Sequence, residues 1–179
     1  VSNFVLISSD KAVRPTNIMG ASKRLAEICV QALYSNQVKH TKFAIVRFGN
    51  VLQSSGSVIP LFDDQIKNNK PITLTNGEMT RFMMTLDDAV DLVMHAFSNG
   101  SNGDIYVQKS PASTIKILID AILSIRNKND YPIHEIGTRH GEKQFEVLCS
   151  KEEMLVAEED GNYFRIPLDN RDLNYEKYF

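Results

Sequence analysis

The sequence predicts an α/β fold that contains a doubly wound parallel sheet, and three segments near its start carry that prediction. Two short apolar runs, Phe4 to Ser8 and Phe43 to Phe48, are typical of strands buried on both faces of a parallel sheet. Between them, from about Asn17 to Tyr34, apolar residues recur every three or four positions, as on one side of a helix. They are Ala21, Leu25, Ile28, Cys29 and Ala32. A strand, a helix and a second strand at this spacing indicate a right-handed parallel crossover.

Two further helices are marked by residues that can cap them. Thr85 precedes an amphipathic stretch, and Asp88 stands at the third helical position, so the pair predicts a capping box. Ser113 is expected to cap a strongly amphipathic helix whose apolar stripe begins at Ile115. The other predicted elements are a helix at 58–67, strands at 72–74, 105–107 and 133–136, and a helix followed by a hairpin or loop after residue 150.

Composition narrows the classes of partner. The chain has 179 residues and a net charge of −2, with acidic and basic residues mixed along it. This length suits one domain with a proper core, and the mixed charge gives no support for nucleic-acid binding or a polybasic membrane contact. No apolar run approaches the roughly 20 residues of a membrane-spanning helix. We therefore expect a cytoplasmic segment, with Cys29 and Cys149 as unpaired thiols and no metal site, because the histidines lack ligand spacing.

Reactive side chains gather directly after the first predicted strand. Ser9, Asp10 and Lys11 place a hydroxyl, an acid and a base where parallel sheets bind ligands, just beyond the carboxyl end of a strand. Met19 and Lys23 follow on the first turns of the next helix and, four residues apart, point to the same side. Spacing alone is also satisfied by a solvated loop followed by an ordinary surface lysine.

A longer pattern around these residues favours the functional interpretation. The segment SSDKAVRPTNIMGASKRLAE, residues 8–27, resembles the active-site segment of the UDP-N-acetylglucosamine 4,6-dehydratases, which are extended short-chain dehydrogenases/reductases. Most of that superfamily has a Tyr-x-x-x-Lys pair, and one dehydratase branch has methionine first, as Met19 and Lys23 do here. The segments VRFGNV, GSVIPLF, EMTRFMM and GTRHGEK are similar to the same family, and the last resembles its Arg-x-Gly-Glu-Lys diphosphate clamp.

The resemblance implies an arrangement of domains and a cofactor. Residues 1–55 would complete the second half of a doubly wound, Rossmann-like sheet, and residues 56–179 would form mainly a small α/β substrate-binding region, with segment 85–108 returning to the Rossmann-like domain. NADP (or NAD) would be the resident cofactor, contacted here by Lys23, Phe48 and Gly49. Since no glycine-rich phosphate-binding turn is present, roughly 110–130 preceding residues are expected to hold most of it. The chain alone is then expected to bind NADP poorly and to be inactive.

Catalytic roles follow from the same resemblance. In 4,6-dehydration, hydride leaves C4 of the sugar, water is eliminated across C5 and C6, and hydride returns at C6, which requires an acid and bases at defined positions. Ser9 would hydrogen-bond O4, Asp10 would protonate the departing C6 hydroxyl, and Lys11 would remove the C5 proton. Lys23 would hold the nicotinamide ribose. Met19 cannot relay a proton, so another group must accept the O4 proton.

The nucleotide half of the substrate is assigned to a second group of residues. Arg81 and Arg139 offer guanidinium forks for two phosphates, and Glu142 would accept from a ribose hydroxyl. The loop through Ser57 would pack under the sugar, and the edge formed by Thr73 and Thr75 would face uracil. The complete predicted substrate-binding set is Asn50, Val51, Ser57, Thr73, Thr75, Arg81, Arg139 and Glu142.

Three functions remain open at this stage. The first is NAD(P)-dependent dehydration of UDP-N-acetylglucosamine or a close UDP-hexosamine for surface polysaccharide or glycan synthesis, by a protein expected to form homo-oligomers. The second is 4-epimerisation, which shares the C4 hydride step but has no use for an acid at C6 and a base at C5. The third is a non-catalytic nucleotide-sugar-binding remnant. A parent tethered to the inner membrane through another segment is compatible with all three.

Overall fold

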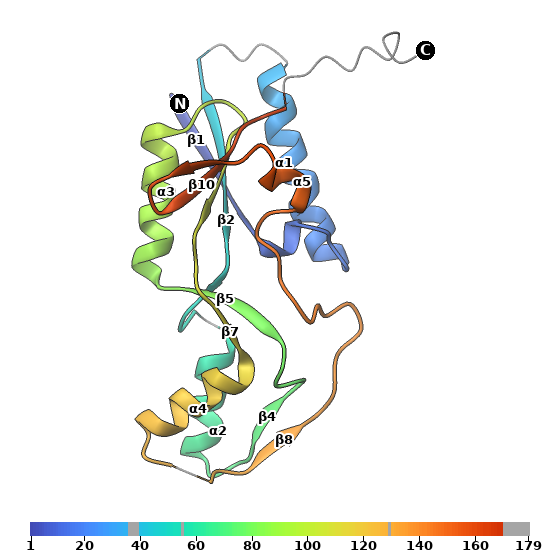
Figure 1. The fold of residues 1–179 in the computed structure, drawn as a ribbon, viewed down its shortest axis with the longest axis vertical. Coiled ribbons are helices and arrows are strands. Elements are labelled where there is room, and N and C mark those ends of the chain that lie inside the picture. Colours follow the sequence, from blue (N-terminus) through green and yellow to red (C-terminus); the bar gives the residue numbers. More distant parts are fainter. Residues whose placement is uncertain (36–39, 55, 129, 170–179) are drawn as a thin grey trace.

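The computed structural model describes residues 1–35, 40–54, 56–128 and 130–169. The hairpin or loop predicted after residue 150 is therefore described only as far as residue 169. Figure 1 shows an elongated molecule with a sheet flanked by helices at one end and a smaller group of two helices and short strands at the other. No helix in the described ranges has both the length and the apolar character needed to cross a bilayer.

A five-stranded sheet forms the larger end. It contains β1 (Asn3–Ser9), β2 (Lys42–Phe48), β6 (Ile105–Gln108), β10 (Tyr163–Ile166) and β9 (Glu158–Asp160), in that order across the sheet. The first three strands are parallel, and β10 pairs antiparallel with β6. The parallel strands confirm the predicted α/β class, and β6, β9 and β10 join this sheet although they come late in the chain.

Helices α1 (Ile18–Ser35) and α3 (Leu86–Asn99) cover opposite faces of this sheet (Figure 1). Strand β2 is buried on both faces, because its successive side chains alternate between two apolar clusters. Phe43 and Ile45 pack on the side of Val30 from α1, while Ala44 and Val46 pack on the side of α3. The prediction of a buried parallel strand at 43–48 is confirmed.

The expected burial of β1 and of α1 was partly wrong. In β1, the side chains of Phe4 and Ile7 are about half exposed, since β1 pairs only with β2 in the described part of the chain. The apolar stripe predicted for α1 is exposed as well, Leu25 to 61%. The helix instead buries Glu27 and Val30. The face that carries Glu27 packs against the sheet, where Arg47 of β2 binds the Glu27 carboxylate. The spacing of apolar residues in α1 gives no sign of this ion pair.

Of the two predicted helix caps, one is confirmed and the other is wrong by one residue. Thr85 and Asp88 form the expected capping box at the start of α3, with the Asp88 amide donating to Thr85 Oγ1 at 3.0 Å. The cap of α4 (Ile115–Ile125) is Thr114, not Ser113, because Thr114 Oγ1 accepts from the amide of Ile117 at 3.2 Å. Ser113 lies inside the short strand β7 (Ala112–Thr114), which delays the start of the helix by one residue.

The smaller end has its own core. Helices α2 (Val58–Lys67) and α4 pack against β4 (Ile72–Leu74), which pairs in parallel with β8 (Ile133–Glu135). This core consists of Phe62, Ile66, Ile72, Leu74, Met79, Ile115, Ile119, Ile122 and Leu123. A second small sheet, β3 (Asn50–Val51), β5 (Thr80–Met84) and β7, connects the two ends, and the short helix α5 (Lys151–Met154) lies against the larger one.

Candidate active site

The predicted catalytic triplet lies at the carboxyl end of β1. Ser9 is the last residue of the strand, and Asp10 and Lys11 form the 3₁₀ turn that follows, where Ser9 Oγ accepts from the Lys11 amide at 3.3 Å. Asp10 is fully buried, and its Oδ1 accepts from Lys11 Nζ at 2.9 Å. Its Oδ2 has no hydrogen-bond partner within the described ranges. Since a buried polar atom without a partner is costly, this carboxylate is suited to meet a polar ligand.

Helix α1 is set tightly against this turn. Asn17 Oδ1 accepts from the amide of Gly20 at 2.9 Å and so satisfies a free N–H of the first helical turn. A Cβ atom on Gly20 would lie 2.4 Å from the carbonyl oxygen of Lys11 and 3.0 Å from Cβ of Pro15. Only glycine therefore allows α1 to approach the loop that carries Lys11.

The three residues predicted to contact the cofactor, Lys23, Phe48 and Gly49, have different surroundings. In the described structure no hydrogen bond or ion pair reaches the half-buried Lys23 ammonium, which leaves it able to donate to ribose hydroxyls. Phe48 packs at the end of β2, and Gly49 follows where β5 crosses, since an added Cβ would lie 2.9 Å from the Phe82 carbonyl oxygen. The free ammonium fits a nicotinamide dinucleotide. Packing against neighbouring strands is enough to explain why Phe48 and Gly49 stand at these positions.

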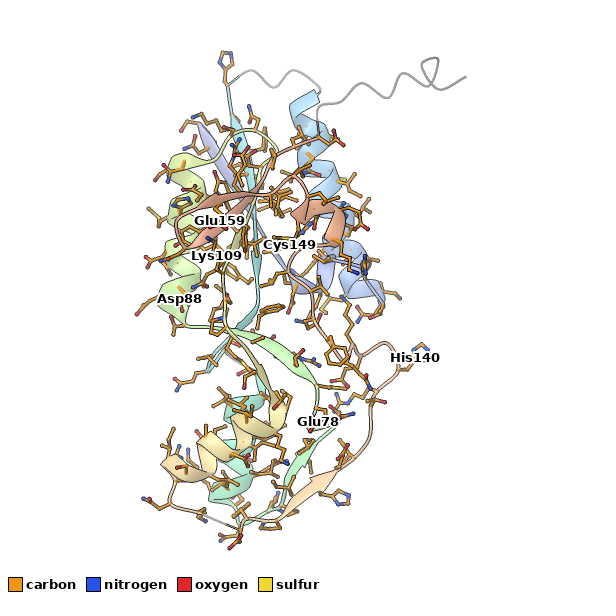
Figure 2. The ribbon with its side chains drawn as sticks, in the orientation of Figure 1. Glu78, Asp88, Lys109, His140, Cys149 and Glu159 are labelled. Carbon is orange, nitrogen blue, oxygen red and sulfur yellow. The ribbon has the colours of Figure 1, made fainter. Side chains whose placement is uncertain are left out.

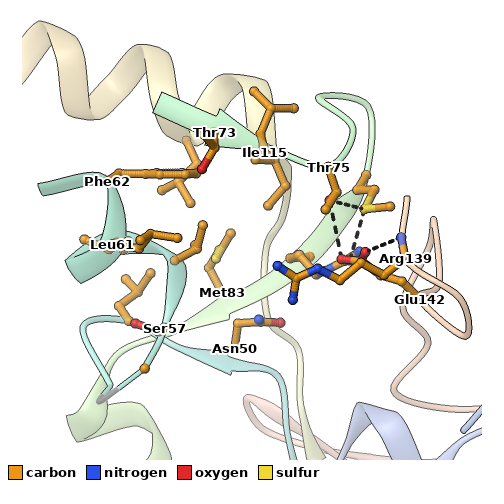
Figure 3. Close-up of a pocket in the computed structure, with 18 of the residues that line it drawn as sticks. Asn50, Ser57, Leu61, Phe62, Thr73, Thr75, Met83, Ile115, Arg139 and Glu142 are labelled. Carbon is orange, nitrogen blue, oxygen red and sulfur yellow. Dashed lines mark hydrogen bonds and ion pairs between the residues drawn. The ribbon is translucent and has the colours of Figure 1, made fainter. Parts of the chain in front are cut away.

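A cavity of about 390 Å³ opens between the two ends of the molecule (Figure 3). Its walls come from α2, α4, β3, β4 and β5. All eight residues of the predicted substrate-binding set line it, namely Asn50, Val51, Ser57, Thr73, Thr75, Arg81, Arg139 and Glu142. The buried atoms Asn50 Oδ1 and Ser57 Oγ have no hydrogen-bond partner in the described structure. A cavity with such atoms is suited to a ligand that carries its own donors and acceptors.

Sequence reasoning missed the apolar lining of this cavity. Leu61, Met79, Met83 and Ile136 face it together with Ile115 of α4. Of these residues only Ile115 was predicted to lie on an apolar stripe, and both Met79 and Ile115 belong to the core cluster of the smaller end. The sequence pattern of an apolar side chain that lies between a core and a cavity is the same as that of an ordinary core residue. The sequence therefore does not distinguish the two.

Thr73 and Glu142 are held by neighbours. The amide of Thr73 donates to Gln65 Oε1 at 3.1 Å, and its hydroxyl accepts from Gln65 Nε2 at 2.7 Å, so these groups are already engaged. Glu142 accepts from Thr75 Oγ1 at 3.4 Å and from the Arg139 amide at 3.3 Å, and it lies 3.6 Å from Arg81 Nη2 (Figure 3). The Arg81 guanidinium and the Arg139 backbone amide thus both meet the Glu142 carboxylate at one rim of the cavity.

A second hollow, of about 190 Å³, connects this rim to the turn of Asp10 and Lys11. Lys11 and Met19 line it together with Asn50, Arg81 and Glu142, which also line the larger cavity. The same hollow is lined by Thr16, Asn17, Gly141, Lys143 and Glu146. The structure therefore places the residues predicted for the sugar next to those predicted for the diphosphate, although more than a hundred residues separate Lys11 from Glu142.

Hydrogen bonds hold the two loops of this hollow together. Thr16 Oγ1 donates to the carbonyl of Gly141 at 2.7 Å, and Lys143 Nζ donates to the carbonyl of Val13 at 2.6 Å. His140, next to Gly141, is exposed and points away from the protein on the outer side of its loop (Figure 2). In the described residues no group of three or more His, Cys, Asp and Glu side chains is placed to hold a metal ion.

Comparison with known proteins identifies the family of this chain. Residues 1–168 match the family described as polysaccharide biosynthesis protein. A protein of Rickettsia bellii named UDP-glucose 4-epimerase is 54% identical over 180 residues, covering 100% of this chain and 52% of the relative. The chain therefore spans about half the length of the curated relatives that it matches.

Solved structures give the same result for the fold. The crystal structure of Pen from Bacillus thuringiensis is 40% identical, with a TM-score of 0.89 over 94% of this chain and 54% of that one. The dTDP-glucose 4,6-dehydratase DesIV of Streptomyces venezuelae, solved with NAD, has a TM-score of 0.75 at 19% identity over 85% of this chain and 52% of its own. Because the family match covers residues 1–168, the chain belongs to the polysaccharide biosynthesis protein family, and it has a Rossmann-like α/β fold.

Proposed function

We propose that the intact protein catalyses the NAD(P)-dependent 4,6-dehydration of UDP-N-acetylglucosamine, or of a close UDP-hexosamine, for surface polysaccharide or glycan synthesis. The observation that carries this proposal is the buried Asp10 carboxylate, which pairs with Lys11 Nζ at 2.9 Å beside a hollow that meets the larger cavity. An acid and an amine side by side are what the elimination across C5 and C6 requires. A 4-epimerase has no step that uses both.

Each residue of the turn has a defined task in this proposal. Asp10 donates a proton to the C6 hydroxyl, which departs as water, and Lys11 removes the proton from C5. Ser9 donates a hydrogen bond to O4, and Lys23 holds the ribose of the cofactor. A nicotinamide dinucleotide, when bound, supplies the site that accepts hydride from C4 and returns it to C6. These roles rest on geometry and on the resemblance of the turn to dehydratases.

The UDP moiety is assigned to the rim and to the larger cavity. Arg139 can fork onto phosphate oxygens. Arg81, whose Nη1 donates to the Thr80 carbonyl at 2.8 Å, adds a second positive charge that matches a diphosphate. The apolar wall that includes Phe62 and Met79 suits the faces of a planar base. We further propose that the substrate is free UDP-sugar in the cytoplasm and that the enzyme works as a homo-oligomer.

Substitution of Asp10 by asparagine tests the reaction. Asparagine is nearly isosteric but cannot supply the proton, so we expect the formation of 4-keto-6-deoxy sugar to fall by about 10²- to 10⁴-fold. Product NMR on UDP-N-acetylglucosamine incubated with the intact enzyme measures this. Unchanged dehydration by the Asp10→Asn variant would falsify the assignment.

The second candidate is a UDP-sugar 4-epimerase, favoured by the name of the Rickettsia relatives at 51–54% identity. It predicts that UDP-glucose or UDP-N-acetylglucosamine is converted to the 4-epimer and that no 4-keto-6-deoxy product accumulates. The same NMR experiment separates the two reactions. The Asp10→Asn variant should retain epimerisation, because inversion at C4 does not eliminate water.

A third candidate, a nucleotide-sugar-binding piece without catalysis, applies to these 179 residues alone. It is favoured by the length of the chain relative to its matches, about half. Isothermal titration of this chain with UDP and with NADP tests it. We expect measurable binding of UDP through Arg81 and Arg139 and little or no binding of NADP. Tight binding of NADP to these residues would contradict this expectation.

A further inference from the structure

One buried carboxylate at the site takes no part in the scheme above. Glu146 follows the clamp segment and lines the hollow of about 190 Å³ that also contains Lys11 and Met19. Its side chain is only 6% exposed, and its Oε2 atom has no hydrogen-bond partner within the described ranges. Leaving such a group unsatisfied is costly, and more so when it is charged, so its position calls for a functional explanation.

The nearest charge to Glu146 is an ammonium that is already engaged. Lys143 Nζ lies 3.5 Å from Glu146 Oε2, beyond an ordinary N–H···O hydrogen bond, and donates instead to the Val13 carbonyl at 2.6 Å. The ammonium therefore compensates the charge of the carboxylate without occupying its lone pairs. Glu146 remains able to accept a proton or a hydrogen bond from a molecule in the hollow.

The other carboxylates near the hollow each have at least one hydrogen bond, although Asp10 Oδ2 has none within the described ranges. Glu142 accepts from Thr75 Oγ1 and from the Arg139 amide. Asp10 is paired with Lys11, and in the proposed reaction it must give a proton rather than take one. Met19, which stands on α1 beside the hollow, has a thioether that does not ionise. Among the described residues lining this hollow, Glu146 is the carboxylate without a hydrogen bond.

We infer that Glu146 is the base that removes the proton from the sugar hydroxyl while that carbon is oxidised. This inference rests on the proposed function. The C–H bond breaks and its hydride passes to the nicotinamide ring, the O–H bond breaks and its proton passes to a Glu146 oxygen, and the carbon–oxygen bond becomes a carbonyl. The oxidant is the nicotinamide dinucleotide of the proposed reaction.

The proton balance closes over the full cycle. Glu146 gains one proton when C4 is oxidised, and Asp10 loses one when the C6 hydroxyl leaves as water. Lys11 takes the C5 proton and returns it when hydride arrives at C6. Exchange with solvent then restores Glu146 and Asp10 to their starting states, so one substrate gives one 4-keto-6-deoxy sugar and one water.

The test compares Glu146→Gln with Glu159→Gln in the intact enzyme. Glutamine keeps the shape but cannot accept the proton, so we expect kcat to fall by about 10²- to 10⁴-fold with KM within about threefold. Glu159 is an exposed carboxylate of the β9–β10 hairpin that pairs with Lys109, and its variant should behave as wild type (Figure 2). A kcat of Glu146→Gln within about threefold of wild type overturns the inference.

A second readout separates a base from a residue that merely supports the site. The 4-keto-6-deoxy product is already oxidised at C4, so exchange of its C5 proton in D₂O needs Lys11 but not Glu146. We expect this exchange, followed by NMR, to persist in Glu146→Gln and to be lost in Lys11→Met. If Glu146→Gln lost the C5 exchange as well as its kcat, Glu146 would be needed for the structure of the site rather than as a base. That result would overturn the inference.

Binding and pH dependence complete the experiment. Titration with UDP should give the same affinity for Glu146→Gln and wild type, because the base does not touch the nucleotide. The acidic limb of the kcat profile should disappear in the variant. The other ionisable groups facing this hollow are Lys11, Arg81, Glu142 and Lys143, and all of them remain in the variant. Survival of the acidic limb in the variant would assign it to one of these groups and overturn the inference.

A second variant, Glu146→Asp, provides a test if Glu146→Gln does not fold, and the test also holds if the enzyme is an epimerase. If Glu146→Gln does not fold, Glu146→Asp keeps a carboxylate but withdraws it by one methylene, and a kcat at least about tenfold lower with exchange intact supports the inference. An unchanged kcat in Glu146→Asp overturns it. If the wild-type enzyme makes the 4-epimer instead, dehydration is wrong, but epimerisation also oxidises C4, and Glu146→Gln still tests the base.

Discussion

The Arg47 guanidinium and the Glu27 carboxylate face each other across two hydrogen bonds, Nε to Oε1 at 2.9 Å and Nη2 to Oε2 at 2.8 Å. The two side chains are 1% and 0% exposed, which makes this a fully buried bidentate ion pair. Arg47 also binds Glu153 of α5, and Ser8 Oγ donates to Glu27 at 2.6 Å. One pair thus connects β2, α1, α5 and β1, the strand that leads into the turn of Asp10 and Lys11.

Removal of the cation from this pair should be strongly destabilising. Arg47→Met would leave the Glu27 carboxylate buried without its main partner, and we expect the free energy of unfolding to fall by about 3–5 kcal/mol. Urea denaturation measures the loss. The matched control is Arg126→Met, because Arg126 pairs with Asp63 nearer the surface, where such a pair contributes about 0–1 kcal/mol. Equal losses in the two variants would contradict the special role of Arg47.

The same pair should make stability depend on acid. Burial alone raises the pKa of Glu27, but the hydrogen bonds and charge of Arg47 outweigh it, so the pKa lies below its usual 4.5; the pKa of Glu153 is lowered in the same way. A lowered folded-state pKa gives stability that is present above the unfolded-state pKa and is lost as pH falls through the folded-state pKa.

We therefore expect the urea midpoint to be level above about pH 5 and to fall progressively below it, as the carboxylates take up protons on unfolding. In Arg47→Met this contribution should shrink or reverse, because a buried carboxylate without its guanidinium is easier to accommodate when protonated. A wild-type midpoint that does not decrease between pH 5 and pH 3 would count against this account.

Gly20→Ala should damage the catalytic turn. The new Cβ would meet the Lys11 carbonyl oxygen at 2.4 Å, a backbone atom that cannot move aside without shifting the turn. A displacement of about 1 Å can lower a rate by about 10²-fold, and we expect a fall in kcat of that order in the intact enzyme. Gly77→Ala is the control, because its nearest neighbour would be 3.5 Å away, and it should keep wild-type turnover.

The two cysteines should react at different rates. Burial raises the pKa of the Cys149 thiol to about 11, and the opposing charge of Arg47 offsets only part of this effect. At pH 8 only about one molecule in a thousand would carry the reactive thiolate at Cys149. Figure 2 shows Cys149 beside α5 in the sheet-containing end, whereas Cys29 is exposed on α1 in this chain.

Mass spectrometry after brief iodoacetamide treatment checks this difference. Cys149 should remain unmodified in the native protein and become alkylated in urea, where both thiols have ordinary access. Rapid native labelling of Cys149 would show that α5 leaves the sheet more readily than its bonds to Arg47 suggest.

Much of the local structure could be predicted without coordinates. Strand β2, the capping box of Thr85 and Asp88, and the short strand β4 depend on residues adjacent in the chain, so their signals are local. The cap of α4 was misplaced by one residue because Ser113 and Thr114 are both good caps, and only pairing of β7 with β5 decides between them. The candidate substrate-binding residues were found through their motifs, and the structure gathers them around one cavity.

The sequence by itself determined which residues are candidates for the chemistry: Ser9, Asp10 and Lys11 at the end of a strand, and arginines in segments that resemble a diphosphate clamp. Only the tertiary structure decided which face of α1 is buried and which carboxylate oxygens at the site have no hydrogen bond. Periodicity counts apolar residues along one segment, whereas the burial of Glu27 depends on Arg47 from another strand. The free oxygen of Glu146 likewise depends on where Lys143 points, which is toward the carbonyl of Val13.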